Sequence, residues 1–239
     1  MFSFYLKKQT GEVIKMNLWE TREQALSAIK TDLQPQAEVI RDAFSILDLC
    51  IERLSALSRT NQFAEVCGLT FIKVRNLALA CYSLALDGLA QEAGAMFRVL
   101  AEVIELLIYF EQEPIRIDEA IKGKLPSAGE IGKKIQGNFQ SLRNSLNQHA
   151  SHFSYTPDSL KHLHDQSGSW KVVQPHQDTV LAINMRWLFV LFLILSNEEM
   201  LCLSKVNALD DGLQAKIEDW REKGQPVFDT KVPRKFMPL

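Results

Sequence analysis

An arginine and two histidines fall close together near the end of one predicted helix. Residues 141–152 read SLRNSLNQHASH and contain Arg143, His149 and His152. An arginine can hold a phosphate group through two hydrogen bonds, and a histidine, with an ordinary pKa of about 6.5, can move the proton of a 2′-hydroxyl. These two residue types are therefore suited to cutting RNA without a metal ion or another cofactor.

Helical geometry decides which of these side chains share a face. Residues three, four and seven apart lie on one face of a helix, so Ser145, His149 and His152 are expected together. Arg143 and Asn147 lie on the neighbouring face. Arg143 and His149 are then about 120° apart around the helix and roughly 9 Å apart along it. The length of the arginine side chain spans much of that gap.

A second line of polar side chains runs along the helix predicted for residues 90–113. This helix is apolar nearly all round, so we expect other helices to enclose it. The polar line is made up of Asp87, Gln91, Arg98, Glu102, Glu105 and Tyr109. Arg98 and Glu102 are four residues apart and can form an ion pair. Two interpretations stay open: a strip that faces water, or a seam inside the bundle that requires a polar partner on the facing helix, which residues 130–152 can supply.

Long helices dominate the predicted fold. The 239 residues include only 11 glycines and 8 prolines, which leaves few turns for a protein of short strands. Thr21 with Gln24, and Ser127 with Glu130, form capping-box patterns, and apolar residues recur at three-four spacing. The expected helices cover about residues 21–33, 35–59, 63–86, 90–113, 130–152, 177–206 and 210–223. The sequence therefore predicts an all-α, up-and-down bundle of six to seven helices.

A single helical-bundle domain is predicted over residues 1–225. Residues 1–16 alternate loosely around Gly11, which fits either a short β-hairpin or an extension. Residues 154–176 read as a long irregular connection with a strand at 170–173, and loops of that length often carry function. Residues 226–239 contain three prolines and are predicted to form an extended tail.

The longest apolar run, residues 180–195, is too short and too polar for a membrane span. It includes Asn184 and Arg186, whereas a spanning helix needs roughly 20 apolar residues. We expect it to be the buried central helix of a soluble bundle, or a dimer face. The first 15 residues lack the features of a secretory signal, and the four cysteines show no metal-binding spacing, which favours core packing in a cytoplasmic protein.

The overall charge does not indicate a DNA partner. The formal net charge is -2, and 46% hydrophobic and 23% charged residues are ordinary for a globular chain. Residues 122–149 carry five basic residues against Glu130 alone. RNA binding relies on such local charge, although a basic helix face is also a common solvated surface.

The helical body, together with Arg143 followed by Asn144 and by His149 near a helix end, resembles the HEPN domains, which are helical RNase and nucleotide-binding domains of toxins and phage-defence systems. The resemblance implies a metal-independent endoribonuclease that works across a homodimer. It implies that Arg143 clamps the phosphate, that Asn144 orients it and that His149 transfers the proton. In this hypothesis Glu102 fixes the histidine tautomer while it pairs with Arg98.

Two other classes of function stay open. In the first, the chain is a non-catalytic helical interaction module, and its polar residues form a structural network that fixes helix register. That network comprises Arg98, Glu102 and His149. The polar residues expected to support the predicted site are Arg98, Glu102, Ser145 and Asn147. In the second, a metal ion binds between a helix end and the following loop, through His149, His152, His162 and His164. No metal or other cofactor is predicted under the first two hypotheses.

Overall fold

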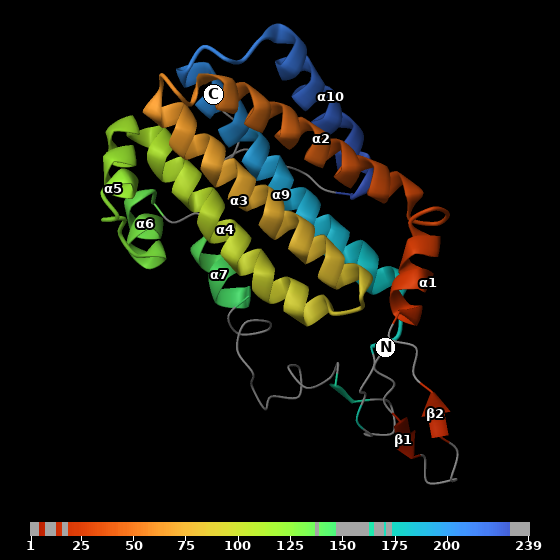
Figure 1. The fold of residues 1–239 in the computed structure, drawn as a ribbon. Helices are drawn as coiled ribbons and strands as arrows, with labels where there is room; N and C mark the ends of the chain where they lie inside the picture. The colour runs from red at the N-terminus through yellow and green to blue at the C-terminus, as the bar shows by residue number, and fades with distance from the viewer. Residues whose placement is uncertain are drawn as a thin grey trace.

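Four long helices lie side by side at the centre of this computed structural model (Figure 1). They are α2 (Gln34–Leu57), α3 (Gln62–Leu86), α4 (Ala90–Gln112) and α9 (Asp178–Lys205). Short turns join α2 to α3 and α3 to α4, so these neighbours run antiparallel, and α9 packs against all three. The structure describes residues 5–7, 13–15, 19–136, 139–146, 163–164, 170 and 174–229.

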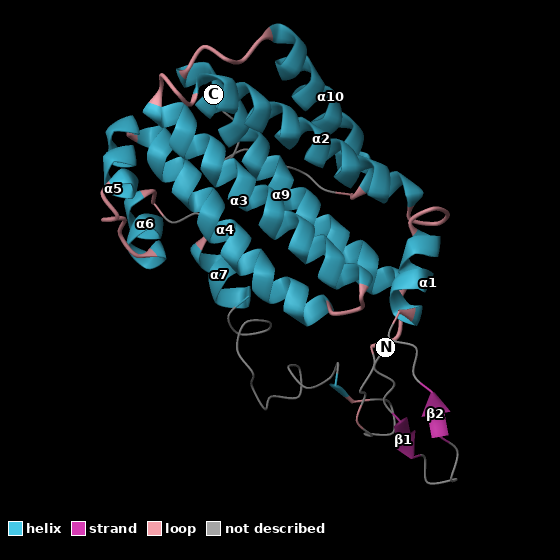
Figure 2. Ribbon diagram, in the orientation of Figure 1, coloured by secondary structure: helices cyan, strands magenta, loops and turns pink. Residues whose placement is uncertain are grey.

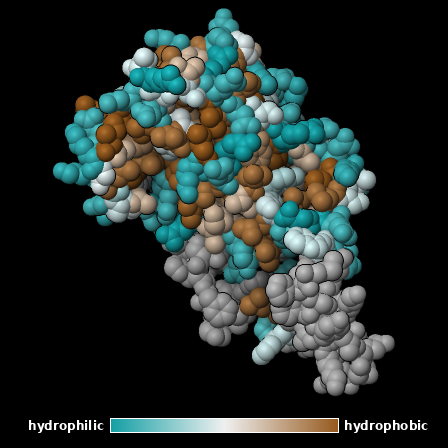
Figure 3. Space-filling model, viewed as in Figure 1, coloured by the Kyte–Doolittle hydropathy of each residue, from teal (hydrophilic) through white to brown (hydrophobic). Residues whose placement is uncertain are grey.

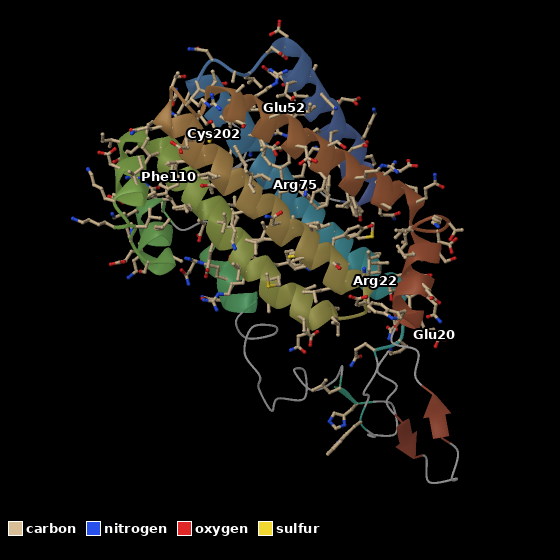
Figure 4. The ribbon with its side chains drawn as sticks, in the orientation of Figure 1. Glu20, Arg22, Glu52, Arg75, Phe110 and Cys202 are labelled. Atoms are coloured by element: carbon tan, nitrogen blue, oxygen red, sulfur yellow. The ribbon has the colours of Figure 1, made fainter. Side chains whose placement is uncertain are left out.

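Shorter helices surround this centre, as Figure 2 shows. They are α1 (Glu20–Ala28), α5 (Ile117–Ile121), α6 (Ala128–Lys134), α7 (Gln140–Leu146) and α10 (Asp211–Val227), with a 3-10 turn at Pro114–Arg116. The Arg22 guanidinium on α1 pairs with Asp87 at the end of α3, with Nε 2.5 Å from Oδ1 (Figure 4). On α10, the indole Nε1 of Trp220 donates to the Val39 carbonyl of α2 at 2.9 Å. Polar anchors of this kind fix the outer helices on the apolar core.

Helix α9 is the buried central helix that the sequence predicts. Its residues from Leu191 to Leu195 are all buried between α2, α3 and α4, so α9 is not a dimer face over that stretch. Helices α3 and α9 are long and apolar enough to cross a membrane by length and composition alone, a test that the core helix of a soluble protein also passes. The four cysteines are buried as free thiols, as core packing requires.

The all-α prediction is confirmed, but the described residues contain nine α-helices rather than six or seven. The single helix expected over residues 130–152 is wrong. It divides into α6 and α7, with Gln136 between them at a φ of 62°. Ile131, Ile135 and Phe139 are spaced four residues apart across the break, as in a continuous helix, and all three are buried. The apolar periodicity therefore gave no sign of the turn between α6 and α7.

Local signals at the helix starts have mixed outcomes. The capping box at Ser127 and Glu130 is confirmed: the Ser127 backbone N–H donates to Glu130 Oε2 at 2.8 Å, and the Glu130 N–H donates to Ser127 Oγ. The capping box expected at Thr21 is wrong, because α1 begins before it and its hydroxyl donates to the Gln174 carbonyl at 2.9 Å. The latter contact joins α1 to the segment that precedes α9.

The two ends of the chain are described only in part. At the N-terminus, β1 (Tyr5–Lys7) and β2 (Val13–Lys15) pair antiparallel, with Leu6 opposite Ile14. At the C-terminus, α10 continues through Pro226 to Val227, so the extended tail does not begin at residue 226 as expected. Of the expected strand at 170–173, only Trp170 is described, and it forms an isolated antiparallel bridge with His164.

Candidate functional site

The second half of the polar line on α4 faces helices α6 and α7. Arg98 and Glu102 are half-buried and form an ion pair, with Nε 3.1 Å from Oε1. Glu105 and Tyr109, one and two turns further on, are completely buried. Helices α6 and α7 pack against this part of α4. The seam inside the bundle is therefore the correct interpretation for the second half of the line.

A buried ion pair joins the seam to α7. Arg143 Nη1 lies 3.0 Å from Glu105 Oε2, and Arg143 is only 6% exposed. The two terminal nitrogens also donate to oxygens of the bundle: Nη1 to the Ala128 carbonyl at 3.1 Å, and Nη2 to Gln140 Oε1 at 2.8 Å. The third nitrogen, Nε, is buried and has no hydrogen-bond partner among the described residues. The guanidinium is thus held between α4, α6 and its own helix.

Burial dominates the electrostatics of this pair. It raises the pKa of Glu105 to about 7, against the opposing effect of the positive charge on Arg143, while the nearby Glu102 carboxylate raises it further. Neither carboxylate oxygen of Glu105 accepts a well-aligned hydrogen bond from the described residues. Charge attraction rather than hydrogen-bond geometry therefore holds Glu105 to Arg143.

A second polar anchor lies at the far end of the seam. The Tyr109 hydroxyl donates to Glu119 Oε2 at 2.7 Å, and Lys134 Nζ donates to the same hydroxyl oxygen at 3.1 Å. The guanidinium of Arg116 lies over the Tyr109 ring, 4.2 Å from its centroid. These contacts tie α5 and α6 to α4, and they use two of the basic residues in this part of the chain for packing.

Of the predicted catalytic residues, the structure describes Arg143 and Asn144, whose side chains lie in different environments. Arg143 is buried, whereas Asn144 is exposed and accepts a hydrogen bond from Gln140 Nε2 at 2.8 Å. Arg143 pairs with Glu105 rather than with Glu102. The backbone of Ser145 is part of α7, but its side chain lies outside the described residues, as do Asn147, His149, His152 and His162.

Local acids reduce the positive charge that the sequence places before His149. Lys122 Nζ lies 3.1 Å from Asp118 Oδ2. Asp118 lies just outside the segment 122–149, so a charge count over that segment omits it. The described part of the surface around α5 and α6 therefore carries charges of both signs.

The metal hypothesis depends largely on residues outside the described part of the chain. Among the residues that the structure describes, no group of three or more His, Cys, Asp or Glu side chains is placed to hold a metal ion. His164 is half-buried and bridges Trp170 through the backbone. The other three candidate ligands, His149, His152 and His162, are not described.

The sequence did not predict a buried polar group in the second half of α9. Glu198 and Glu199 are buried, and burial raises the pKa of each to about 8. Arg221 of α10 covers this region: its Nε donates to Ser196 Oγ at 2.8 Å, and its Nη2 donates to Asn197 Oδ1 at 2.6 Å. The available signal was four consecutive polar residues, 196–199, inside a helix expected to be enclosed on all sides.

An apolar groove of about 490 Å³ opens between α3, α4 and α5. Its lining is mostly aliphatic and aromatic, with Glu65 and Lys73 among the few charged residues. The lining consists of Gln62, Glu65, Val66, Leu69, Thr70, Lys73, Val103, Leu106, Phe110, Ala120, Ile121 and Leu125. Arg143 and Glu105 do not line it, so the groove and the buried ion pair are separate features.

Comparison with known proteins adds no family. No protein-family model matches the chain, and neither a curated protein nor a solved structure is significantly similar to it. The resemblance to HEPN domains therefore rests on the helical body and on Arg143, Asn144 and His149.

Proposed function

We propose that the chain is a non-catalytic helical interaction protein in which the pair of Arg143 and Glu105 sets how α6 and α7 pack on α4. The observation that carries this proposal is the burial of Arg143, whose two terminal nitrogens, Nη1 and Nη2, face Glu105, Ala128 and Gln140. An arginine that clamps a phosphate must present its guanidinium to the substrate. This guanidinium is committed to the interior of the protein.

A buried ion pair contributes more to the relative positions of the helices that it joins than to the net stability of the fold. Removing two charges from water costs several kcal/mol, and their attraction repays that cost only in part. A charged arginine inside the bundle is tolerated in one arrangement, the one in which Glu105 faces it. The pair therefore disfavours alternative registers of α7 on α4, as expected for a module whose outer surface must keep a fixed shape.

The apolar groove between α3, α4 and α5 supplies the surface for interaction. Leu69, Ile121 and Leu125 are exposed around it. Large exposed aliphatic side chains gathered at one site are typical of a protein interface. The proposal includes the two predictions that follow from the sequence: a cytoplasmic location and self-association of the chain.

A metal-independent endoribonuclease of the HEPN type is the second candidate. The observation that favours it is the carboxyl group of Glu105, whose pKa of about 7 suits proton transfer and whose oxygens accept no well-aligned hydrogen bond from the described residues. In this hypothesis His149 is the proton-transfer residue, Asn144 orients the phosphate and Arg143 must leave Glu105 to reach it.

RNA cleavage in the presence of EDTA separates the two candidates. Purified full-length protein and its His149→Ala variant are incubated with single-stranded RNA, and their melting temperatures are measured alongside. The interaction hypothesis predicts that neither protein cleaves the RNA. Cleavage by the wild type that His149→Ala abolishes, with an unchanged melting temperature, would overturn it.

A stability comparison of two arginines tests the structural role directly. Arg143→Ala is expected to lower the free energy of unfolding by about 3–5 kcal/mol, because it leaves Glu105 buried without its partner. Arg98→Ala is the matched control, since Arg98 also pairs with a glutamate of α4 but is half-buried, and we expect a loss of at most about 1 kcal/mol. Equal effects would remove the basis for a special role of Arg143.

A further inference from the structure

Helix α3 carries a regular stripe on the face turned away from the core. Leu69, Ile72, Asn76 and Leu79 are spaced three, four and three residues apart and are all exposed. Leu69 is 61% exposed, Ile72 40% and Leu79 48%. Figure 3 shows hydrophobic residues gathered over α3 and α4 on the face toward the viewer. Three-four spacing is the pattern by which one helix packs against another, so this face is built for a further helix.

The exposed stripe of α3 forms an apolar ridge, and the groove between α3, α4 and α5 lies next to it. Leu69, the most exposed apolar residue of the stripe, also lines the groove between α3, α4 and α5. Val66 and Phe110 lie within the groove. A surface that holds both a protruding apolar ridge and a neighbouring apolar groove can pack against a second copy of itself, because a two-fold axis brings each ridge into the other groove.

The charges on α3 select a second copy in the antiparallel orientation. Glu65 and Lys73 lie four residues before and four residues after Leu69, about 6 Å along the helix in each direction. If two α3 helices cross antiparallel at Leu69, each Glu65 faces the Lys73 of the other copy. The same symmetry places Val66 opposite Ile72. In a parallel pair, like charges would face each other.

These two charges have no partner within the described part of this chain. Among the described residues, the side chains of Glu65 and Lys73 form no hydrogen bond and no ion pair. The remaining charge of α3, Arg75, is already used: it pairs with Asp48 of α2, with Nη2 3.1 Å from Oδ2 (Figure 4). The two charges left over on α3 are thus of opposite sign and are placed symmetrically around the most exposed leucine.

We propose that the chain forms a homodimer through α3, with the two copies antiparallel, Leu69 at the two-fold axis and Glu65 paired with Lys73 across the interface. This inference rests on the proposed function as an interaction protein and names its partner as a second copy of the chain. The polar residues Asn76 and Gln62, which face each other in this register, allow amide-to-amide hydrogen bonds at the interface.

Sedimentation velocity of the full-length protein over a micromolar concentration range tests the proposal. The wild type is expected to dimerise, and Leu69→Glu is expected to raise the dissociation constant at least about tenfold, because it places a charge at the centre of the interface. Leu26→Glu on α1 is the matched control, because Leu26 is also an exposed leucine on a helix but lies outside α3. Its dimer should be unchanged.

Charge exchange tests the orientation. Glu65→Lys and Lys73→Glu, made singly, should each weaken the dimer by roughly three- to tenfold, because each creates like-charge contacts across the axis. The double variant Glu65→Lys/Lys73→Glu should restore it, because the exchanged charges attract again in the antiparallel register. In a parallel pair the single changes would not weaken the dimer, and that result would overturn the orientation.

Two outcomes overturn the dimer itself. One is a wild type that stays monomeric at every concentration, whether or not it binds another protein or a lipid vesicle. The other is a dimer that Leu69→Glu leaves intact, which would place the contact elsewhere. Failure of the proposed function is separate: a dimer that cleaves RNA in EDTA through His149 refutes the non-catalytic role and leaves the α3 interface standing.

Discussion

Gly132 of α6 provides the space in which the guanidinium of Arg143 lies. A Cβ atom at residue 132 would overlap Nη2 of Arg143 and would lie 3.1 Å from its Cζ. The absence of a side chain at this one position lets α7 bring its arginine across α6 to Glu105 on α4. A residue expected only to weaken a helix is therefore what permits the buried ion pair.

Replacing Gly132 with alanine should displace Arg143 from Glu105. We expect the free energy of unfolding of Gly132→Ala to fall by about 1–3 kcal/mol, because the methyl group overpacks the site and the buried pair separates. Urea unfolding measures this change. Gly129→Ala is the control on the same helix, since a Cβ there meets no atom within 4 Å.

The control should be neutral or stabilising by up to about 1 kcal/mol, as alanine is the better helix former. If Gly132→Ala matched Gly129→Ala in stability, Arg143 would not require the space that Gly132 leaves.

Stability should decrease as the pH rises from about 5 to about 8. Burial raises the pKa of Glu198 and Glu199 to about 8, so the folded protein keeps protons that the unfolded chain releases above its ordinary pKa. Below that ordinary value both states are protonated and the full stability is present. Between the two values unfolding releases protons, and stability falls by roughly 1 kcal/mol per pH unit for each glutamate.

Urea unfolding at a series of pH values checks this dependence. Glu198→Gln and Glu199→Gln should each flatten it, because glutamine stays neutral in both states. Glu52→Gln is the matched control on the exposed face of α2 (Figure 4) and should leave the dependence unchanged. A wild type more stable at pH 8 than at pH 5.5 would contradict the predicted dependence on the two glutamates.

Helix α10 packs closely on the core at Gly224. Gly224 lies against the ring of Phe189 on α9: a Cβ there would overlap Cε2, and it would lie 3.0 Å from Cγ1 of Val39. Gly224→Ala should lower the free energy of unfolding by about 1–3 kcal/mol, because the stacked rings of Phe189 and Phe228, whose centroids are 4.7 Å apart, leave no room for a shift.

Thermal unfolding provides the comparison with Gly212→Ala, a control in the first turn of the same helix. A Cβ at Gly212 would make only an ordinary contact, 3.4 Å from Asp210 Oδ1. Gly224→Ala should melt at a lower temperature than the wild type, whereas Gly212→Ala should not. Similar melting temperatures for both would indicate that α10 moves freely on the core.

The long helices were predictable from the sequence because burial leaves a periodic record of apolar residues. The break between α6 and α7 was not, since Ile131, Ile135 and Phe139 stay in phase across it. Spacing also placed Glu102 and Glu105 on the same seam. It did not reveal which of them meets Arg143, because the rotation of α4 against α7 depends on the packing of both helices.

The acidic residues of α9 escaped prediction for a different reason. Charged residues are rarely buried without a partner, so a prediction from sequence places them on the surface. Glu198 and Glu199 are buried because neighbouring helices enclose α9 on all sides from Leu195 to Cys202. No face of the helix is exposed over these residues, and this enclosure is known only from the three-dimensional structure.

A double-mutant cycle on Arg143 and Glu105 tests the central claim most directly. The free energy of unfolding in urea is measured for the wild type, Arg143→Met, Glu105→Leu and the double variant. Each single change should cost about 3–5 kcal/mol, because it leaves one buried charged group alone, whereas the double variant should lie within about 1 kcal/mol of the wild type. Additive losses, or single variants as stable as the wild type, would contradict a structural pairing of Arg143 with Glu105.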